Sequence, residues 1–174
     1  AERTVLDLLP PELARPGARL YPVGRLDKDS EGLLLLTDDG DWTQRLLHPR
    51  YGVEREYAVG LRSPLDERQE ESLRDGIALD EGLAGLVSLR LATDVESGRL
   101  EDRHQRGRLT WYRAVLTQGW KRQLRRMFAA VGTPVEPLER VRIGTLRLDD
   151  LAPGAARELT VAERDRLASL GASR

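Results

Sequence analysis

The sequence predicts an α+β fold in which helices flank a largely antiparallel mixed sheet. Segments with strand character come in clusters separated by single helices, without the regular strand–helix alternation of a parallel sheet. The chain has 174 residues, 40% hydrophobic and 33% charged, a composition typical of a globular protein. We therefore expect one domain over residues 1–174. Within it, the leucine run at 33–36, bounded by Gly32 and Asp-Asp-Gly, predicts a short strand buried on both faces.

The N-terminal half supplies three helices and three further strands. Residues 4–9 predict a short helix that ends at two prolines, and 19–23 predict a strand after a Pro-Gly turn. Helical spacing at 41–47 ends at His-Pro. Strict alternation at 54–61 predicts a half-buried strand. A helix at 63–75, begun by Ser-Pro and ended by glycine, precedes a strand: 86–92.

The C-terminal half begins with a polar segment at 93–107, which has no apolar period and predicts a long loop. Strand character returns at 109–117. A helix is expected at 122–131 and a strand at 140–148. A Thr-Val-Ala-Glu capping box predicts a final helix at 160–171.

Composition excludes several classes of protein. Without cysteine there is no disulfide, thiolate nucleophile or cysteine metal site. No apolar run could span a bilayer and no signal peptide is visible, so we expect a cytoplasmic protein without a membrane partner. The formal charge is −1, yet acids dominate at 63–82 and bases at 119–147. Charge alone favours a solvated, ion-paired surface, although a basic face on a neutral protein can bind an anionic polymer.

The most distinctive stretch is 22–40 (PVGRLDKDSEGLLLLTDDG), which places a charged loop directly before the leucine run. A loop held by a buried strand can fix a catalytic carboxylate, and Asp27 is the candidate. The same acids approximate a calcium loop. Glu31 and Asp38 at its fifth and twelfth positions, and a strand in place of the second helix, argue against calcium.

Other site motifs are missing from the sequence. His48 and His104, the only histidines, stand in no ligand-spaced cluster, so we expect no metal. No nucleophile elbow, Walker loop or dinucleotide fingerprint occurs. Asp27 and Asp29 could indicate glycosidase chemistry, but two residues apart in a loop they form only a weak signal.

The segment 119–128 (GWKRQLRRMF) crowds basic side chains onto the start of a helix, where free N–H groups favour a phosphate or carboxylate. The alternative is a basic helix face on the surface. The sequence leaves open which of the two Arg125 belongs to. Tyr57 has the same ambiguity, since a strand tyrosine is more often a core or rim residue than a base-stacking one. Three apolar side chains of this helix are expected in the core: Leu124, Met127 and Phe128.

Together these segments resemble the RsuA/RluB-type ribosomal RNA pseudouridine synthases. Residues 22–40 are similar to the family's catalytic motif. Residues 55–59 (REYAV) are similar to its second motif, with arginine where lysine is usual. Residues 119–128 are similar to the third, where Trp-Lys replaces a basic residue and asparagine, and 140–144 (RVRIG) matches the following strand. The resemblance covers nearly the whole chain in the right order.

The resemblance implies the pseudouridine synthase fold, with a central RNA-binding cleft, and cofactor-free isomerisation of one uridine in folded RNA. Asp27 would promote cleavage of the N-glycosidic bond before uracil rejoins the ribose through carbon 5. Tyr57 would stack on the extruded base and assist proton removal from carbon 5. Arg125 would pair with Asp27 and keep it ionised. Further RNA contacts would come from Arg25, Leu26, Lys121, Arg122, Arg126 and Arg140, at or near the basic stretch.

Family members normally carry an S4-type RNA-binding domain ahead of this region. Because the chain opens at Ala1, just before the catalytic motif, we expect it to be a piece of a longer protein without that domain. Residues 49–54 (PRYGVE) and the strand at 140 favour the large-subunit branch, and so 23S ribosomal RNA as the partner of a monomer. The alternatives are a 16S enzyme of the same family and a non-catalytic RNA-binding or ribosome-assembly domain. Intact Asp27, Tyr57 and Arg125 argue against a pure binder.

Overall fold

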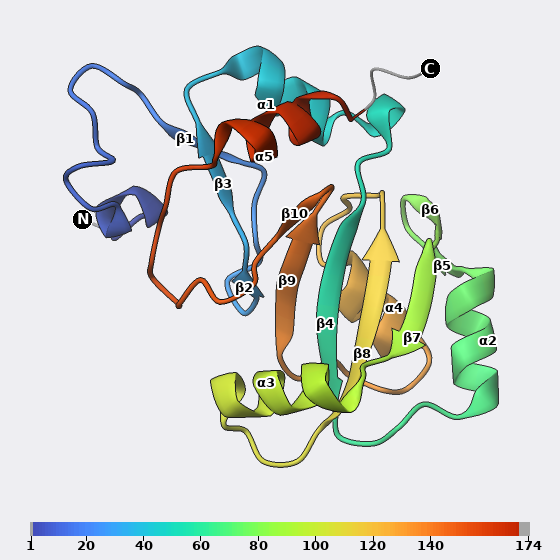
Figure 1. The fold of residues 1–174 in the computed structure, drawn as a ribbon. Coiled ribbons are helices and arrows are strands. Elements are labelled where there is room, and N and C mark those ends of the chain that lie inside the picture. Colours follow the sequence, from blue (N-terminus) through green and yellow to red (C-terminus); the bar gives the residue numbers. More distant parts are fainter. Residues whose placement is uncertain (1, 171–174) are drawn as a thin grey trace.

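The computed structural model describes residues 2–170 and confirms the α+β class (Figure 1). No helix in this range is long and apolar enough to cross a membrane. The strands are β1 (Tyr21–Val23), β2 (Glu31–Gly32), β3 (Leu35–Thr37), β4 (Arg55–Leu61), β5 (Ile77–Leu79), β6 (Gly82–Ala84), β7 (Ser88–Leu91), β8 (Thr110–Leu116), β9 (Leu138–Ile143) and β10 (Leu146–Arg147). The helices are η1 (Val5–Leu8), α1 (Gly40–Leu47), η2 (Pro49–Tyr51), α2 (Glu67–Asp75), α3 (Asp94–His104), α4 (Gln123–Ala130) and α5 (Val161–Ala168).

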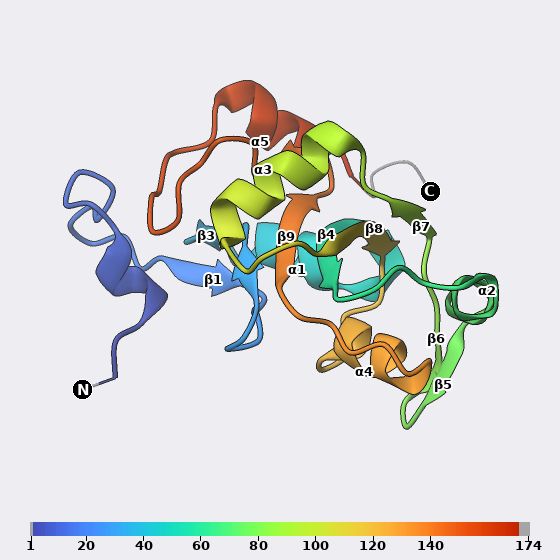
Figure 2. The same ribbon diagram turned by 90° about the horizontal axis from the view of Figure 1, so that it is seen from below.

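The central sheet has the strand order β10-β9-β4-β8-β7, and its six strands include β2, which joins β9 in parallel. The other strand pairs within residues 2–170 are antiparallel. Helices α3 and α4 lie on opposite faces of this sheet (Figure 2). The strand predicted at 54–61 is confirmed as β4, but the prediction that it is half-buried is wrong: Val59 and Leu61 join the core under α4, while Ala58 on the other face joins the core under α3.

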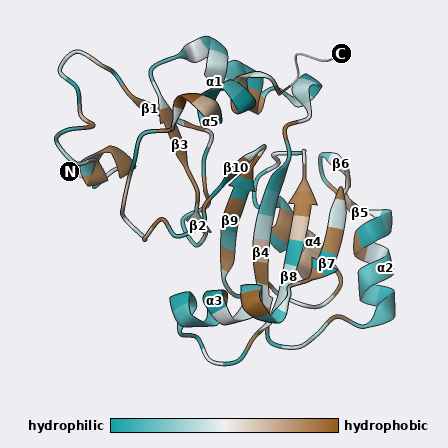
Figure 3. Cartoon of the chain, in the orientation of Figure 1, coloured by the Kyte–Doolittle hydropathy of each residue, from teal (hydrophilic) through white to brown (hydrophobic). Residues whose placement is uncertain are grey.

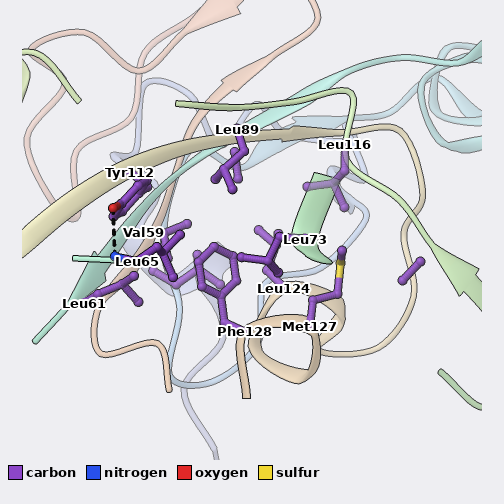
Figure 4. Close-up of a cluster of buried hydrophobic side chains, with 13 residues drawn as sticks. Val59, Leu61, Leu65, Leu73, Leu89, Tyr112, Leu116, Leu124, Met127 and Phe128 are labelled. Carbon is purple, nitrogen blue, oxygen red and sulfur yellow. Dashed lines mark hydrogen bonds between the residues drawn. The ribbon is translucent and has the colours of Figure 1, made fainter. Parts of the chain in front are cut away.

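The larger core lies between the sheet and helices α2 and α4 (Figure 4). The predicted core residues Leu124, Met127 and Phe128 are all buried there. Full burial of each such side chain stabilises the fold by about 1.5–3 kcal/mol relative to exposure. The Leu65 amide donates a 2.9 Å hydrogen bond to the Tyr112 hydroxyl inside this core. Helix α4 is therefore held firmly on the sheet, and with it the basic residues at its start.

The prediction of a long loop at 93–107 is wrong, because α3 occupies most of this segment. Its start is a capping box in which Thr93 and Glu96 exchange side-chain–backbone hydrogen bonds. Only Leu100 is buried on this helix, so the segment shows no apolar period. Charged contacts replace that period: Arg90 donates two 2.8 Å hydrogen bonds to the Glu96 carboxylate. The hydropathy colouring of Figure 3 shows α3 as largely hydrophilic.

The leucine run lies in a second core, formed by the two-stranded sheet β1–β3 with α1, α5 and β10. The prediction that the run is a strand buried on both faces is wrong. Leu33 and Leu35 are buried, whereas Leu34 and Leu36 are half-buried and line a groove, and only the second half of the run is in β3. The partners of the buried leucines in this core include Leu46, Ile143, Leu146 and Leu167.

Several element boundaries differ from the prediction. The helix expected at 4–9 is the single 3-10 turn η1, and α2 begins after Asp66 rather than Ser63. The strand expected at 140–148 is a hairpin of β9 and β10, and a further hairpin of β5 and β6 was not predicted. The end expected for the last helix, Gly171, lies outside the described residues.

The two cores meet where β2 joins β9. Gly32 has φ +110°, and a Cβ added to it would lie 2.3 Å from the carbonyl oxygen of Arg140. The Leu33 amide donates to that carbonyl at 2.8 Å, and Arg140 Nε donates to the Leu33 carbonyl at 2.8 Å. Glycine is required here both for its positive φ and for the close approach of two backbones.

We therefore expect Gly32→Ala to be much more destabilising than Gly154→Ala. Both positions have positive φ, which costs a non-glycine residue about 1–2 kcal/mol, but nothing lies within 4 Å of a Cβ at Gly154. At Gly32 the clash adds about 1–3 kcal/mol. Urea denaturation of the two variants measures this difference. Equal reductions in unfolding free energy would show that β2 does not pack closely on β9.

A second prediction concerns acid stability. The hydrogen bonds from Arg90 lower the pKa of Glu96 from 4.5 to about 2. Because the folded-state pKa is depressed, the ionised form stabilises the protein above pH 4.5, and this stability is lost as the pH falls towards 2. Glu96→Gln keeps a capping residue but removes the charge, so its unfolding free energy should change less over this pH range than that of the wild type. Glu101→Gln, exposed on the same helix, should keep the wild-type pH profile.

Candidate active site

Asp27 lies in the loop that joins β1 to β2, which we call the Asp27 loop (residues 24–30). The Ser30 amide donates a 2.9 Å hydrogen bond to the Asp27 carbonyl and closes a tight turn. The Asp27 side chain is half-buried, and its carboxylate forms no hydrogen bond or ion pair with other residues in 2–170. The carboxylate is therefore held by a defined backbone yet has its oxygens available to a ligand.

The predicted pairing of Arg125 with Asp27 is wrong in this structure, because Arg125 contacts Asp29 instead. Its Nη2 donates to the Asp29 carbonyl at 2.6 Å, and its Nε lies 3.4 Å from Asp29 Oδ2. Arg122 donates two hydrogen bonds, 2.7 and 3.0 Å long, to the Asp29 carboxylate. The hydrogen bonds from Arg122 are the main reason that the pKa of Asp29 is lowered. Arg122 and Arg125, at the start of α4, thus bond the Asp27 loop at Asp29, two residues after Asp27.

Tyr57 and Arg140 are paired neighbours on β4 and β9. Tyr57 is half-buried and packs against the core under α4. It therefore lies at the rim of the core, with part of the residue accessible to solvent. Arg140 was predicted to contact RNA, but it is 3% exposed and bonds the Leu33 carbonyl. Its Nη2 is buried without a hydrogen-bond partner in residues 2–170, so the guanidinium retains a donor for a further partner.

Arg55 stands two residues before Tyr57, where the family resemblance leads one to expect lysine. Its Nη1 donates to the Thr117 carbonyl at 3.2 Å and its Nη2 to the Leu46 carbonyl at 3.3 Å. Burial is the main cause of its lowered pKa. The planar guanidinium reaches both carbonyls at once and so connects β4 to the segments on either side, which a lysine ammonium would do less well.

The other residues predicted to contact RNA differ in their exposure and in whether they already have a partner in the protein. Arg25 and Lys121 are exposed, whereas Leu26 is half-buried and lines the groove beside the leucine run. Arg126 is engaged by Glu81, in the turn between β5 and β6, through hydrogen bonds of 2.9 and 2.7 Å. Those hydrogen bonds lower the pKa of Glu81. An anionic ligand of Arg126 therefore has to compete with an internal carboxylate.

A cavity of about 360 Å³ borders the Asp27 loop and α4. Its polar lining includes Lys28, Asp29, Glu31, Arg106, Arg125 and Glu136. A larger groove, of about 910 Å³, runs between the leucine run and the N- and C-terminal segments, and its lining does not include Asp27, Tyr57 or Arg125. No group of three or more His, Asp or Glu side chains able to hold a metal occurs within residues 2–170.

Glu81 and Gln123 were not singled out in the sequence, and Asp29 was considered only as a weak signal of glycosidase chemistry. Gln123 is 4% exposed and accepts a 3.3 Å hydrogen bond from the Trp120 amide at the start of α4. Asp29 and Glu81 are ordinary loop acids in the sequence. The spacing of Asp29 from Asp27 drew attention to it, but spacing alone does not identify its partners.

A half-buried carboxylate on a short turn, in a loop held by arginines at the start of α4, has the residue type and setting that acid–base or nucleophilic chemistry requires. Residues 9–130, more than half of the chain, match the family of RNA pseudouridylate synthases, and the chain belongs to this family. This confirms the resemblance noted in the sequence.

The relatives include ribosomal enzymes of both subunits. The chain is 40% identical over 157 residues to ribosomal large subunit pseudouridine synthase E of Xanthomonas axonopodis pv. citri, covering 87% of this chain and 79% of that protein. It is 41% identical to ribosomal small subunit pseudouridine synthase A of Yersinia pestis, covering 88% and 59%. It is 38% identical to ribosomal large subunit pseudouridine synthase B of Salmonella typhimurium, covering 96% and 53%. The chain thus spans little more than half the length of two of these three relatives.

Among solved structures, a crystal structure of a pseudouridylate synthase is similar to 94% of this chain, with a TM-score of 0.74 and 32% sequence identity. This chain covers 65% of that protein. The similarity supports the predicted pseudouridine synthase fold.

Proposed function

We propose that this chain isomerises a specific uridine of ribosomal RNA to pseudouridine, with Asp27 as the catalytic carboxylate. The observation that carries the proposal is the placement of Asp27. Its loop is bonded to α4 and continues into β2, which pairs with β9, while its carboxylate has no partner within residues 2–170. Membership of the family and the names of the relatives support the reaction and the class of RNA.

The isomerisation breaks the bond from N1 of uracil to C1′ of the ribose and forms a bond from C5 to C1′. A proton leaves C5 and N1 gains one, so the reaction conserves all atoms and needs no redox partner. Asp27 would promote cleavage of the glycosidic bond, and Tyr57 would stack on the extruded base and assist removal of the C5 proton. Arg125, which bonds Asp29 two residues further along the loop, would contribute a fixed positive charge near the Asp27 carboxylate. Base extrusion is favoured when an aromatic ring replaces part of the stacking in the RNA.

RNA binding is assigned to the basic residues around the site. Arg25 and Lys121 are exposed, and Arg122 and Arg126 lie on or beside α4. We infer a 23S rather than a 16S substrate because residues 49–54 and the strand at 140 resemble the large-subunit branch. The enzyme would act as a monomer in the cytoplasm. A non-catalytic RNA-binding domain is the alternative, and the experiment below separates it from the enzyme.

The first prediction on function concerns Asp27. Asp27→Asn removes the charge with almost no change in volume, so pseudouridine formation should stop while the melting temperature stays near that of the wild type. Asp41→Asn, an exposed acid on α1, is the matched control and should leave the activity intact. The measurement is a pseudouridine map of ribosomal RNA from cells with wild-type protein, each variant, or none.

One modified position that disappears in both the Asp27→Asn and the null cells establishes the activity and identifies the subunit. A map that is the same in all four strains would refute isomerisation of ribosomal RNA and favour the binding-domain candidate.

A second prediction concerns Arg126 and its internal partner. Arg126→Ala should weaken RNA binding for all sequences. It should also reduce the slope of log affinity against log salt by about 0.7–0.9, because the protein then neutralises one phosphate fewer. Glu81→Gln should act in the opposite direction, because it frees Arg126 from a competing carboxylate. Fluorescence anisotropy at several salt concentrations measures both. An unchanged slope in Arg126→Ala would show that this side chain serves the protein rather than the RNA.

A further inference from the structure

Asp29 makes the side-chain contacts that connect the Asp27 loop to α4. Its carboxylate receives two hydrogen bonds from Arg122, and its carbonyl receives one from Arg125. Bidentate guanidinium–carboxylate pairs fix both distance and orientation, unlike a single-point contact. The loop segment that follows Asp27 therefore has a defined position relative to the helix.

The backbone at Arg122 indicates that this contact is maintained at a cost. Arg122 has φ +50° and ψ +33°, a left-handed conformation that is unfavourable for a residue with a side chain, and it supplies no side-chain cap to α4. An arginine at a helix start also meets the positive end of the helix dipole. Neither feature favours arginine for helix stability, whereas both are explained if this position has to direct a guanidinium at Asp29.

Arg125 is also anchored to the segment between α4 and β9. Its Nη1 donates to the carbonyls of Val135 and Glu136, each at 3.2 Å, and its side chain is only 11% exposed. The core around Leu124 and Phe128 holds α4 on the sheet that carries Tyr57. The chain of contacts therefore runs from the sheet through α4 and Arg125 to Asp29, and from there along two residues of backbone to Asp27.

We propose that Asp29 is a positioning residue for the reaction: by pairing with Arg122 and Arg125 it holds the Asp27 carboxylate in register with Tyr57 on the central sheet. This inference rests on the proposed function. It assigns to Asp29 no contact with the substrate. Its effect should accordingly fall on the rate of the chemical step rather than on the affinity for RNA.

The test compares Asp29→Asn with Glu163→Gln. Glu163 also accepts a bidentate pair, from Arg157, but on α5, away from the Asp27 loop, and glutamine keeps its capping role. The substrate is a ribosomal RNA transcript that contains the target uridine, incubated with an excess of the full chain. We expect the single-turnover rate of Asp29→Asn to fall about 10- to 100-fold, the reduction typical of a catalytic group displaced by about 1 Å. RNA affinity should not fall, since Asp29 is assigned no contact with RNA and its neutralisation leaves Arg122 available to a phosphate, as Glu81→Gln does for Arg126. Glu163→Gln should match the wild type in both.

A second variant separates positioning from folding. Arg122→Gly removes the guanidinium and relieves the backbone strain, so it should not destabilise the protein, yet it should slow the reaction as Asp29→Asn does. If the two residues act as a pair, the double variant is no slower than the slower single variant. Hydrogen exchange of the peptide spanning residues 24–33 should be faster in both single variants, independently of any activity.

The outcomes are distinguishable. Wild-type rates and exchange in Asp29→Asn would overturn the positioning role, and so would weaker RNA affinity at an unchanged single-turnover rate. A wild-type protein that forms no pseudouridine in any ribosomal RNA would instead overturn the proposed function, and the role of Asp29 in catalysis with it.

Discussion

The contact between β2 and β9 is the constraint on which the rest of the site depends. It joins the core around the leucine run to the core under α4, with two backbones closer together than a methyl group would allow. Arg140 supports this contact from β9 with its backbone and with its side chain. Because the Asp27 loop ends where β2 begins, the close packing at Gly32 determines where the loop leaves the sheet.

The charges of the free protein are arranged so that most of the basic side chains at the start of α4 already have acidic partners. Arg122 and Arg125 meet Asp29, and Arg126 meets Glu81. An ion-paired surface, which charge alone favoured, is therefore compatible with an RNA-binding surface. Exposed ion pairs contribute little stability, so an RNA phosphate can replace a carboxylate at modest cost. The pair at Glu81 lies in the turn between β5 and β6, outside the Asp27 loop, whereas the pairs at Asp29 join that loop to α4. If Asp29 is a positioning residue, only the pair at Glu81 can be exchanged without moving the Asp27 loop.

Patterns that arise from one-sided burial could be read from the sequence. The helical spacing of Leu124, Met127 and Phe128 records a single apolar core, and that prediction was confirmed. The alternation at 54–61 identified the strand β4 but not its burial, because β4 packs on a core at each of its faces. Helix α3 could not be recognised in this way because it buries only Leu100 and is otherwise held by charged contacts. The leucine run gave a wrong prediction of burial for the opposite reason. Leu34 and Leu36 are apolar but line a groove, so an unbroken apolar run did not mean burial on both faces.

The site shows where sequence reasoning reaches its limit. A short motif can single out Asp27 as the candidate carboxylate, because residue type and loop context are local properties. The partner of Arg125 is not local, since Asp27 and Asp29 are two residues apart in one loop and both are acids within reach of the same helix start. The structure separates them by the turn at Ser30 and by the grip of Arg122, which direct the Asp29 carboxylate to α4. The two acids therefore differ in their contacts: Asp29 bonds the start of α4, whereas the Asp27 carboxylate has no partner within residues 2–170 and, in the proposed function, is available to the substrate.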